Sequence, residues 1–295
     1  MKGMTTETAK LKPTLPAWSI GSTIQNALLW IFLILIAGLT LFPIVMAFLG
    51  SFKSNAELTG GATIFPEVWH FSNYAEVWEQ AHFSTYTWNS LFISIVTTVG
   101  TLIVASMAAY AVDRLSFAGK SLYVAIQAST MFVSIGAVVL RPQFELMVKL
   151  QMHTSLWGVI LIMVSGHAYI FFILLSFVKA IPRELDEAAM IDGCSKMWIY
   201  TRIIFPLLKP GLGVAALFTF RHAWNEYILP LVFTMSQPKL QTLTVGLAGL
   251  RYGIASAAQT HYMMAGACLS ILPLLIVYVL ANKSFMQVTS GSIKG

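Results

Sequence analysis

The chain has 295 residues, of which 57% are hydrophobic and only 10% are charged, and its formal net charge is +6. Because soluble globular domains carry about 25% charged residues, this composition excludes an ordinary soluble protein and indicates an integral membrane protein. In such a protein an excess of lysine and arginine usually reports orientation and does not suggest nucleic-acid binding, so the distribution of these residues matters more than their total.

Six apolar runs predict helices that cross the roughly 30 Å of hydrocarbon in a bilayer. They indicate an all-α integral membrane fold with spans at about 27–49, 87–112, 122–140, 156–178, 206–234 and 263–282. Residues 1–26 are polar and precede a run too long for a signal peptide, so we expect a retained N-terminal segment. The predicted transmembrane domain covers residues 27–283, and residues 284–295 form a predicted tail.

The second predicted span is rich in small and hydroxylated residues, among them Ser94, Thr97, Ala105 and Ala109. Small side chains let membrane helices approach one another closely, so we place this span inside a bundle. Longer mixed stretches, 50–86 and 235–262, predict loops on one face of the membrane, and a short polar loop covers 141–155 on the same side.

The distribution of basic residues predicts the orientation of the chain. Twelve of the 18 lie in the N-terminal segment, the 113–121 loop, the 179–209 segment and the tail, whereas five lie on the opposite face and Arg221 lies within the fifth predicted span. By the positive-inside rule this asymmetry places both termini in the cytoplasm and both larger loops outside.

A short polar stretch, residues 182–193, lies between the fourth and fifth predicted spans. Pro182 can occupy the first turn of a helix, where its missing N–H is not needed. Acidic residues then favour the positive end of that helix, and Gly193 can take the left-handed conformation that ends it. Taken alone, this pattern also fits an ordinary interfacial helix.

The residues around this stretch narrow the interpretation. Glu187-Ala188-Ala189 is followed by Gly193 and, after nine further residues, by Ile203 and Pro206. This spacing resembles the EAA signature of ABC importer permeases, in which the segment is a coupling helix that sits in a groove of the ATPase subunit. Phe205 stands where that family often has leucine. The resemblance implies that the ATPase-docking residues are Glu184, Asp186, Glu187, Ala188, Ala189, Met190, Asp192 and Gly193.

Further motifs along nearly the whole chain resemble the maltose-type branch of these permeases, which imports carbohydrates, and within it the smaller six-span subunit. The motifs are Trp88-Asn89-Ser90, Ala108-Ala109-Tyr110-Ala111, Arg114 with Phe117-Ala118-Gly119-Lys120, Ile181-Pro182-Arg183-Glu184-Leu185, and Trp224-Asn225-Glu226-Tyr227 with Pro230-Leu231. The resemblance implies four partners in a bacterial inner membrane: a second related permease, an ATPase dimer on the cytoplasmic side, an extracytoplasmic substrate-binding protein and a saccharide. ATP and Mg would be bound by the ATPase, so this chain is expected to hold no cofactor and to contact membrane lipid but no nucleic acid.

The fifth predicted span contains a polar cluster, residues 221–227. Buried ionisable groups in a membrane are costly and usually face a cavity or a partner. His222 and Glu226 are four residues apart and could pair on one helix face, while Arg221 and Asn225 share the neighbouring face. A structural clasp between helices explains this cluster as well as a translocation path does. In a path, the cationic pair would suit an anionic saccharide such as an oligouronate.

A histidine in the fourth predicted span, His167, is more often structural than ligand-binding, but it joins the candidates for the path together with Tyr169. The full set of path candidates is Arg221, His222, Trp224, Asn225, Glu226, Tyr227, His167 and Tyr169. On the outer side, the resemblance implies that the 235–262 loop reaches into the docked binding protein. The contact candidates there are Gly249, Leu250, Arg251, Tyr252 and Gly253; from the residues alone, this is only a flexible loop rich in small side chains.

Two other classes of function fit the sequence less well. A secondary transporter predicts internal repeats and ion sites near the midplane of several helices, whereas this sequence has one charged cluster and a predicted docking helix. A membrane-embedded enzyme needs a nucleophile with its base, or metal ligands, and the sequence has no H-E-x-x-H, G-x-S-x-G or Cys/His cluster. Gly119-Lys120-Ser121 is no phosphate-binding loop, because Arg114 stands where that motif needs glycine. We therefore expect a non-catalytic transport subunit with no catalytic and no metal-binding residues.

Overall fold

The computed structural model describes residues 20–61, 63–80, 82–132, 136–252 and 259–291. These residues form helices, turns and loops, and the described part of the chain contains no β-strand, in agreement with the all-α prediction. The chain divides into two compact units, Met1–Met46 and Ala47–Gly295. Most of the predicted N-terminal segment lies outside the described residues.

The described part of the first unit is a single helix. α1 (Ile20–Gly50) begins there, and its last turn belongs to the second unit. Its stretch Gln25–Gly50 is long and apolar enough to cross a membrane, which confirms the first predicted span. The side chains are exposed in spite of their apolar character, and Leu39, for example, is 71% exposed. A surface this apolar requires lipid or another protein around it.

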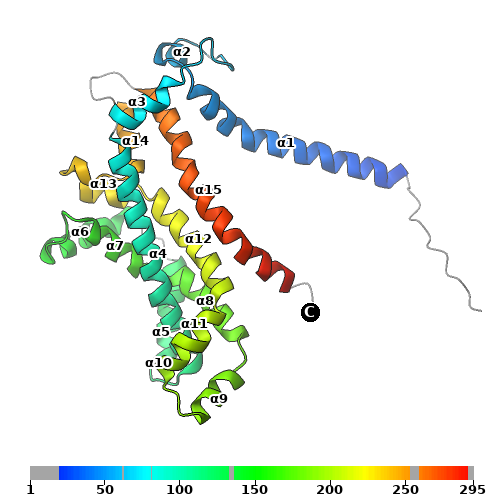
Figure 1. The fold of residues 1–295 in the computed structure, drawn as a ribbon, viewed down its shortest axis with the longest axis vertical. Coiled ribbons are helices and arrows are strands. Elements are labelled where there is room, and N and C mark those ends of the chain that lie inside the picture. The colour runs from blue at the N-terminus through cyan, green and yellow to red at the C-terminus, as the bar shows by residue number, and fades with distance from the viewer. Residues whose placement is uncertain (1–19, 62, 81, 133–135, 253–258, 292–295) are drawn as a thin grey trace, which may run out of the picture. The chain divides into compact units, whose positions relative to one another are not determined.

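The second unit is built around α4 (Phe83–Arg114), which confirms the second predicted span and its place inside a bundle. It packs against α7 (Leu156–Ser165), α8 (Ala168–Ala180) and α12 (Lys209–Asn225), and α12 packs in turn on α15 (Thr260–Gly291) (Figure 1). The buried face of α4 is a stripe of small side chains three or four residues apart, namely Ser90, Ser94, Thr97, Thr101, Ala105 and Ala109. The spacing of one helical face therefore explains why three helices can pack closely on α4.

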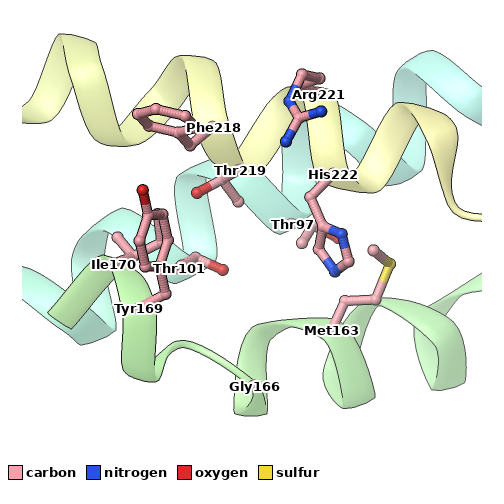
Figure 2. A pocket seen from close by; sticks show the side chains of 10 residues that line it. All are labelled: Thr97, Thr101, Met163, Gly166, Tyr169, Ile170, Phe218, Thr219, Arg221 and His222. Carbon is pink, nitrogen blue, oxygen red and sulfur yellow. The ribbon is translucent and has the colours of Figure 1, made fainter. Parts of the chain in front are cut away.

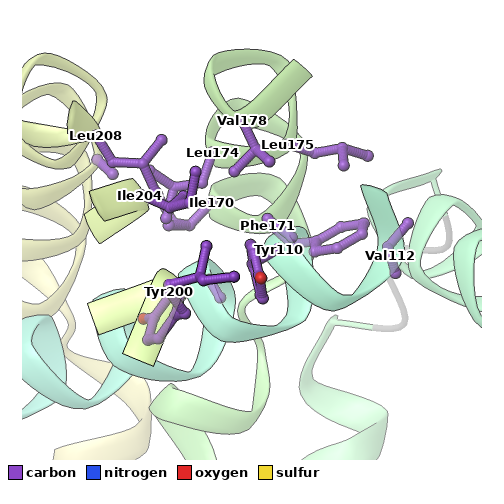
Figure 3. Close-up of a cluster of buried hydrophobic side chains, with 14 of the residues drawn as sticks. Tyr110, Val112, Ile170, Phe171, Leu174, Leu175, Val178, Tyr200, Ile204 and Leu208 are labelled. Carbon is purple, nitrogen blue, oxygen red and sulfur yellow. The ribbon is translucent and has the colours of Figure 1, made fainter. Parts of the chain in front are cut away.

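A large apolar cluster joins α4 and α8 to the segment that leads into α12 (Figure 3). That segment consists of α10 (Lys196–Ile199), the π-helical turn η2 (Tyr200–Ile204) and α11 (Phe205–Leu207). Phe171, Leu174 and Ile204 are completely buried in the cluster. The hydroxyls of Tyr200 and Ser106 are 2.7 Å apart, so the cluster also holds a buried hydrogen bond.

The third predicted span, 122–140, is wrong as a single helix. α5 (Lys120–Phe132) ends after 13 residues, and a short 3-10 turn, η1 (Gly136–Val139), leads into α6 (Leu140–Lys149). The polar stretch predicted as a loop is thus largely helical. Pro142 is tolerated in the first turn of α6, and Arg141 pairs with Glu145 one turn later at 2.9 Å.

The fourth and fifth predicted spans are both broken. α7 and α8 meet at an angle of 50° around Gly166 and His167. The α10–α11 segment and α12 meet at an angle of 77° beside Leu208. Pro206 and Pro210 lie on either side of this bend, and each lacks the backbone N–H that would continue the helical hydrogen bonds. α12 ends at Asn225, and α13 (Ile228–Thr234) is a separate helix. The described residues thus contain three unbroken candidate spans, or up to five if each bent pair counts as one.

The sixth predicted span is confirmed by Thr260–Leu280, although α15 continues to Gly291 and so includes most of the predicted tail. Both predicted loops contain helices. α2 (Asn55–Gly60) and α3 (Ser72–Gln80) lie in the first, and η3 (Pro238–Leu240) and α14 (Leu243–Tyr252) lie in the second. Short helices of this kind are hard to predict from the sequence, because packing against α4 or α15 stabilises them more than their own helix propensity does.

Candidate functional site: a cavity on α12 and an exposed helix, α9

A cavity of about 270 Å³ lies where α4, α7, α8 and α12 meet (Figure 2). Its lining residues come from all four helices and from the break between α7 and α8: Thr97, Thr101, Met163, Gly166, Tyr169, Ile170, Phe218, Thr219, Arg221 and His222. In Figure 2 the side chain of His222 extends from α12 toward Met163 of α7. The bend at Gly166 thus contributes directly to the wall of the cavity.

Three of the predicted path residues, Arg221, His222 and Tyr169, line this cavity together. Tyr169 stands edge-on to Phe218, with the ring centroids 5.7 Å apart. Arg221 and His222 are both exposed and adjacent on α12, so two basic side chains reach the same space. This arrangement provides a polar, cationic wall opposite an aromatic one.

The hydroxyls of Thr97 and Thr101 were not predicted as site residues, yet both line the cavity. Each threonine is 2% exposed, and neither hydroxyl has a hydrogen-bond partner among the described residues. Buried polar atoms are nearly always paired, so two unpaired hydroxyls on one wall indicate room for water or a ligand there. Their sequence signal was a pair of threonines four residues apart, but the same span carries several other hydroxylated residues that made this pair inconspicuous.

The other path candidates do not gather at the cavity. Trp224 is buried, where its indole Nε1 donates to the Ser270 carbonyl at 3.1 Å and its ring stacks on Phe220. The exposed Asn225 donates to the carbonyl of Arg221 at 2.9 Å, one turn back in α12. Both side chains support the alternative of a structural clasp at this end of α12.

The predicted pairing of His222 with Glu226 on one helix face is wrong, because α12 ends at Asn225 and Glu226 is extended. The Glu226 carboxylate instead accepts from the backbone N–H of Leu229, and Tyr227 precedes the first residue of α13. His167 lies at the break between α7 and α8, where its Nδ1 is 3.1 Å from the Val164 carbonyl. The local contact of Nδ1 fits the structural role that a lone histidine usually has, whereas Nε2 is buried without a hydrogen-bond partner among the described residues.

The polar stretch between the bent pairs forms α9 (Glu184–Ile191), and its end has the predicted geometry. Gly193 has φ +80°, and its N–H donates to the Met190 carbonyl at 3.1 Å. The N–H of Cys194 donates to the Ala189 carbonyl at 3.0 Å. These two bonds form a Schellman motif, which requires a left-handed residue at the position of Gly193.

Most of the predicted docking residues of α9 are exposed, whereas two face the interior of their own unit. The exposed residues are Glu184, Glu187, Ala188, Met190, Asp192 and Gly193. Ala189 is 6% exposed and belongs to the large apolar cluster, and Asp186 is also 6% exposed. These two are therefore corrected from docking residues to internal contacts. Ile191, which was not predicted, is 87% exposed and adds an apolar side chain to the outward face of α9.

Arg114 holds α9 against the ends of α4 and α8. The sequence indicated this arginine only as part of a motif. Its Nε lies 3.1 Å from the Asp186 carboxylate, and Nη1 donates to Asp113 at 2.8 Å. Its Nη2 donates to the carbonyls of Ile181 at 2.6 Å and Val178 at 3.3 Å, near the end of α8. Burial raises the pKa of the Asp186 carboxyl, and the Arg114 guanidinium opposes that rise.

The predicted contacts for a binding protein fall on α14, which is a helix and not a flexible loop up to Tyr252. Leu250 is 5% exposed and packs in an apolar cluster with Phe83 and Trp224, so it is not an outward contact. Gly249 faces open space. Arg251 and Tyr252 form the last turn of α14, and Gly253 lies outside the described residues. Among the described residues, no group of three or more His, Cys, Asp or Glu side chains is arranged to hold a metal ion.

Known proteins resemble this chain over nearly its whole length. It is 31% identical to the arabinooligosaccharides transport system permease protein AraQ of Halalkalibacterium halodurans, over 93% of this chain and 98% of that protein. It is also 31% identical to the trehalose transport system permease protein SugB of Mycobacterium tuberculosis, over 88% of this chain and 95% of that protein. A crystal structure of a bacterial ABC transporter involved in the import of the acidic polysaccharide alginate contains a chain with a TM-score of 0.79 and 26% identity, which covers 91% of this chain and 99% of that one.

The family described as binding-protein-dependent transport system inner membrane component matches residues 85–287, which include nearly all of α4, the cavity, α9 and most of α15. This match covers more than half of the chain, and both relatives are more than 30% identical to it over most of their length. The chain therefore belongs to the family of binding-protein-dependent transport system inner membrane components.

Proposed function

We propose that this chain is a permease subunit of an ABC importer for carbohydrate, and that it forms half of the translocation pathway. Its relatives carry names of arabinooligosaccharide and trehalose transport, and the similar crystal structure is of an alginate importer. The family assignment argues against the alternative of a secondary active transporter. The observation that carries the proposal is the cavity between α4, α7, α8 and α12, where Arg221, His222 and two unpaired threonine hydroxyls meet.

The proposed substrate is an anionic saccharide such as an oligouronate. Hydroxyl groups of a sugar can bond to Thr97 and Thr101, and a ring can stack against Tyr169, which is 48% exposed. A carboxylate needs a cationic partner when it leaves water, and Arg221 can offer two parallel N–H donors to it. The likeness to a transporter involved in the import of an acidic polysaccharide supports this choice of substrate class.

The proposed coupling element is the outward face of α9, which would dock on an ATPase dimer in the cytoplasm. That dimer would bind ATP and Mg, and this chain would remain non-catalytic. Closure of the dimer would move α9, and the helices packed above it would change between inward-open and outward-open arrangements. The orientation with both termini in the cytoplasm, six crossings and contact of Gly249 with an extracytoplasmic binding protein remain parts of this proposal.

An uptake assay in vesicles that contain the complete transporter and its binding protein tests the proposal. Replacement Arg221→Ala is expected to lower uptake of an acidic oligosaccharide by about tenfold or more, because a charge-assisted hydrogen bond is lost. Arg221→Lys keeps the charge and is expected to retain most of the uptake. Equal uptake of the acidic saccharide by the alanine variant and the unmodified protein would refute the anionic substrate. Absence of any ATP-dependent saccharide uptake by the unmodified protein would refute the importer itself.

A further inference from the structure

A second cavity, of about 450 Å³, lies at the end of the bundle near α9 and opens between α4, α5 and α8. It shares no lining residue with the cavity beside Arg221. Lys120 begins α5 and Lys179 lies in the last turn of α8, and both line this cavity. Neither ammonium group forms a hydrogen bond or ion pair with another described residue. The mouth of the cavity therefore carries two positive charges that have no partner among the described residues.

The one acidic lining residue, Asp113, does not neutralise these lysines. Its carboxylate already accepts from Arg114 at 2.8 Å and lies 3.4 Å from Arg183 Nη2. Its side chain is only 7% exposed, so little of the carboxylate remains for another cation. The first N–H groups of α5 add partial positive charge beside Lys120. An anion is the ligand that this electrostatic environment favours.

The cavity changes from charged to apolar along its length. From Lys120 the lining continues along α5 through Val124 to Ala128, a distance of about 12 Å for eight residues of helix. On α8 the lining passes from Lys179 to the buried Leu175, one turn deeper, at the edge of the apolar cluster in Figure 3. A small anion would fill only the charged end and leave the apolar end empty.

We propose that this cavity binds one anionic phospholipid, with the phosphate of its headgroup between Lys120 and Lys179 and the start of an acyl chain along Val124, Ala128 and Leu175. Basic pockets at the ends of membrane helices bind anionic headgroups in this way. Members of this family are inner membrane components, so membrane lipid is available to the cavity between α4, α5 and α8. The inference goes beyond the proposed function and does not depend on which saccharide is carried.

Native mass spectrometry of the purified transporter complex, with phosphatidylglycerol or phosphatidylcholine of the same acyl chains added to the micelles, tests this site. The unmodified complex is expected to retain phosphatidylglycerol in preference to phosphatidylcholine. The double variant Lys120→Gln/Lys179→Gln is expected to bind phosphatidylglycerol about 30-fold more weakly, since each lysine near an anionic lipid is worth roughly 1 kcal/mol. The control Lys196→Gln/Lys209→Gln removes the same charge from exposed residues outside this cavity and is expected to change binding less than twofold, on the order of experimental error.

A second variant, Ala128→Leu, fills the apolar end without a change of charge and is also expected to weaken phosphatidylglycerol binding, whereas Ala118→Leu in the exposed loop is not. Thermal unfolding shows whether each variant folds.

Two binding results would overturn the proposal. In the first, the unmodified complex retains phosphatidylglycerol and phosphatidylcholine equally. In the second, Lys196→Gln/Lys209→Gln weakens phosphatidylglycerol binding as much as Lys120→Gln/Lys179→Gln does. Displacement of the lipid by millimolar inorganic phosphate would also overturn it, because that would indicate a small-anion site. A second permease subunit that covers the cavity would leave every variant unchanged and overturn it too. ATP-driven uptake, measured separately, reports on the proposed function alone.

Discussion

The cavity beside Arg221 and the corner around Arg114 both contain buried polar groups in an apolar chain. They differ in whether those groups have partners within the chain. At the cavity, the hydroxyls of Thr97 and Thr101 are buried without a partner among the described residues. At the corner, Arg114 forms ion pairs with two carboxylates and donates hydrogen bonds to two backbone carbonyls, from three segments of the chain. Its contact with Asp186 is an ion pair at 3.1 Å, because neither Arg114 Nε nor the Asp186 carboxylate has a hydrogen-bond partner among the described residues. Buried hydroxyls with neither a hydrogen bond nor an ion pair indicate a place for a ligand, whereas opposite charges paired within the chain indicate a joint that holds helices in position.

This comparison separates residues that looked alike in the sequence. Asp186 and Glu187 are neighbouring acids in one predicted docking stretch, yet Asp186 is buried against Arg114 and Glu187 is exposed. Likewise Arg221 and Arg114 are both arginines near helix ends. The first faces a cavity, and the second has a side chain that is only 5% exposed. If the contrast is right, substitutions at the corner should mainly lower stability, and substitutions at the cavity should mainly lower transport.

The largest effect on stability is expected from Arg114→Ala. This change leaves the Asp186 carboxylate buried without its partner and frees the carbonyls of Ile181 and Val178, so we expect a loss of roughly 3 to 5 kcal/mol of unfolding free energy. Arg183→Ala is the matched control, because Arg183 also contacts Asp113 but its side chain is 64% exposed. That control is expected to cost about 1 kcal/mol or less. Unfolding of the purified complex in detergent measures both, and equal losses would contradict the role of Arg114 as a joint.

A smaller effect is expected from Gly193→Ala at the end of α9. The glycine has φ +80° and open space around its α-carbon, so an added methyl group strains the backbone by about 1 to 2 kcal/mol without a clash. Gly119→Ala is the control, since Gly119 has φ +87° and equally open space but precedes α5.

The two glycine variants should therefore lose similar amounts of unfolding free energy. An assay of ATP-driven saccharide uptake distinguishes between them. If α9 docks on an ATPase, the ratio of saccharide transported to ATP hydrolysed should fall in the Gly193 variant and stay normal in the Gly119 variant. Unchanged coupling in both variants would remove the support for α9 as the docking helix.

The smallest effect on stability is expected from Thr97→Val at the cavity. Valine has nearly the same shape, and the hydroxyl that it replaces has no partner among the described residues, so the unfolding free energy should change by about 0.5 kcal/mol or less. Ser106→Ala in the large apolar cluster removes the partner of the buried Tyr200 hydroxyl and should cost about 1 to 3 kcal/mol. A large loss of stability in Thr97→Val would show that its hydroxyl is part of the packing and not of a ligand site.

Features that depend on a single segment could be predicted from the sequence. The spans in α1, α4 and α15 follow from the length and hydropathy of continuous runs, which no other part of the chain can alter. The left-handed glycine that ends α9 follows from residues within one helical turn. Residues Arg221, His222 and Tyr169 could be proposed because charged and aromatic side chains are conspicuous in an apolar run.

Features that depend on packing between segments were decided by the tertiary structure alone. The break at Gly166, the division of the fifth predicted span at Asn225 and the burial of Asp186 and Leu250 were missed, although each lies in a correctly located region. Composition and spacing describe a residue's own segment, whereas burial depends on what a neighbouring helix presents. The sequence alone therefore determined that this chain is a membrane permease with a short polar helix between its fourth and fifth apolar runs. The tertiary structure decided which of its polar residues face a cavity and which hold the helices together.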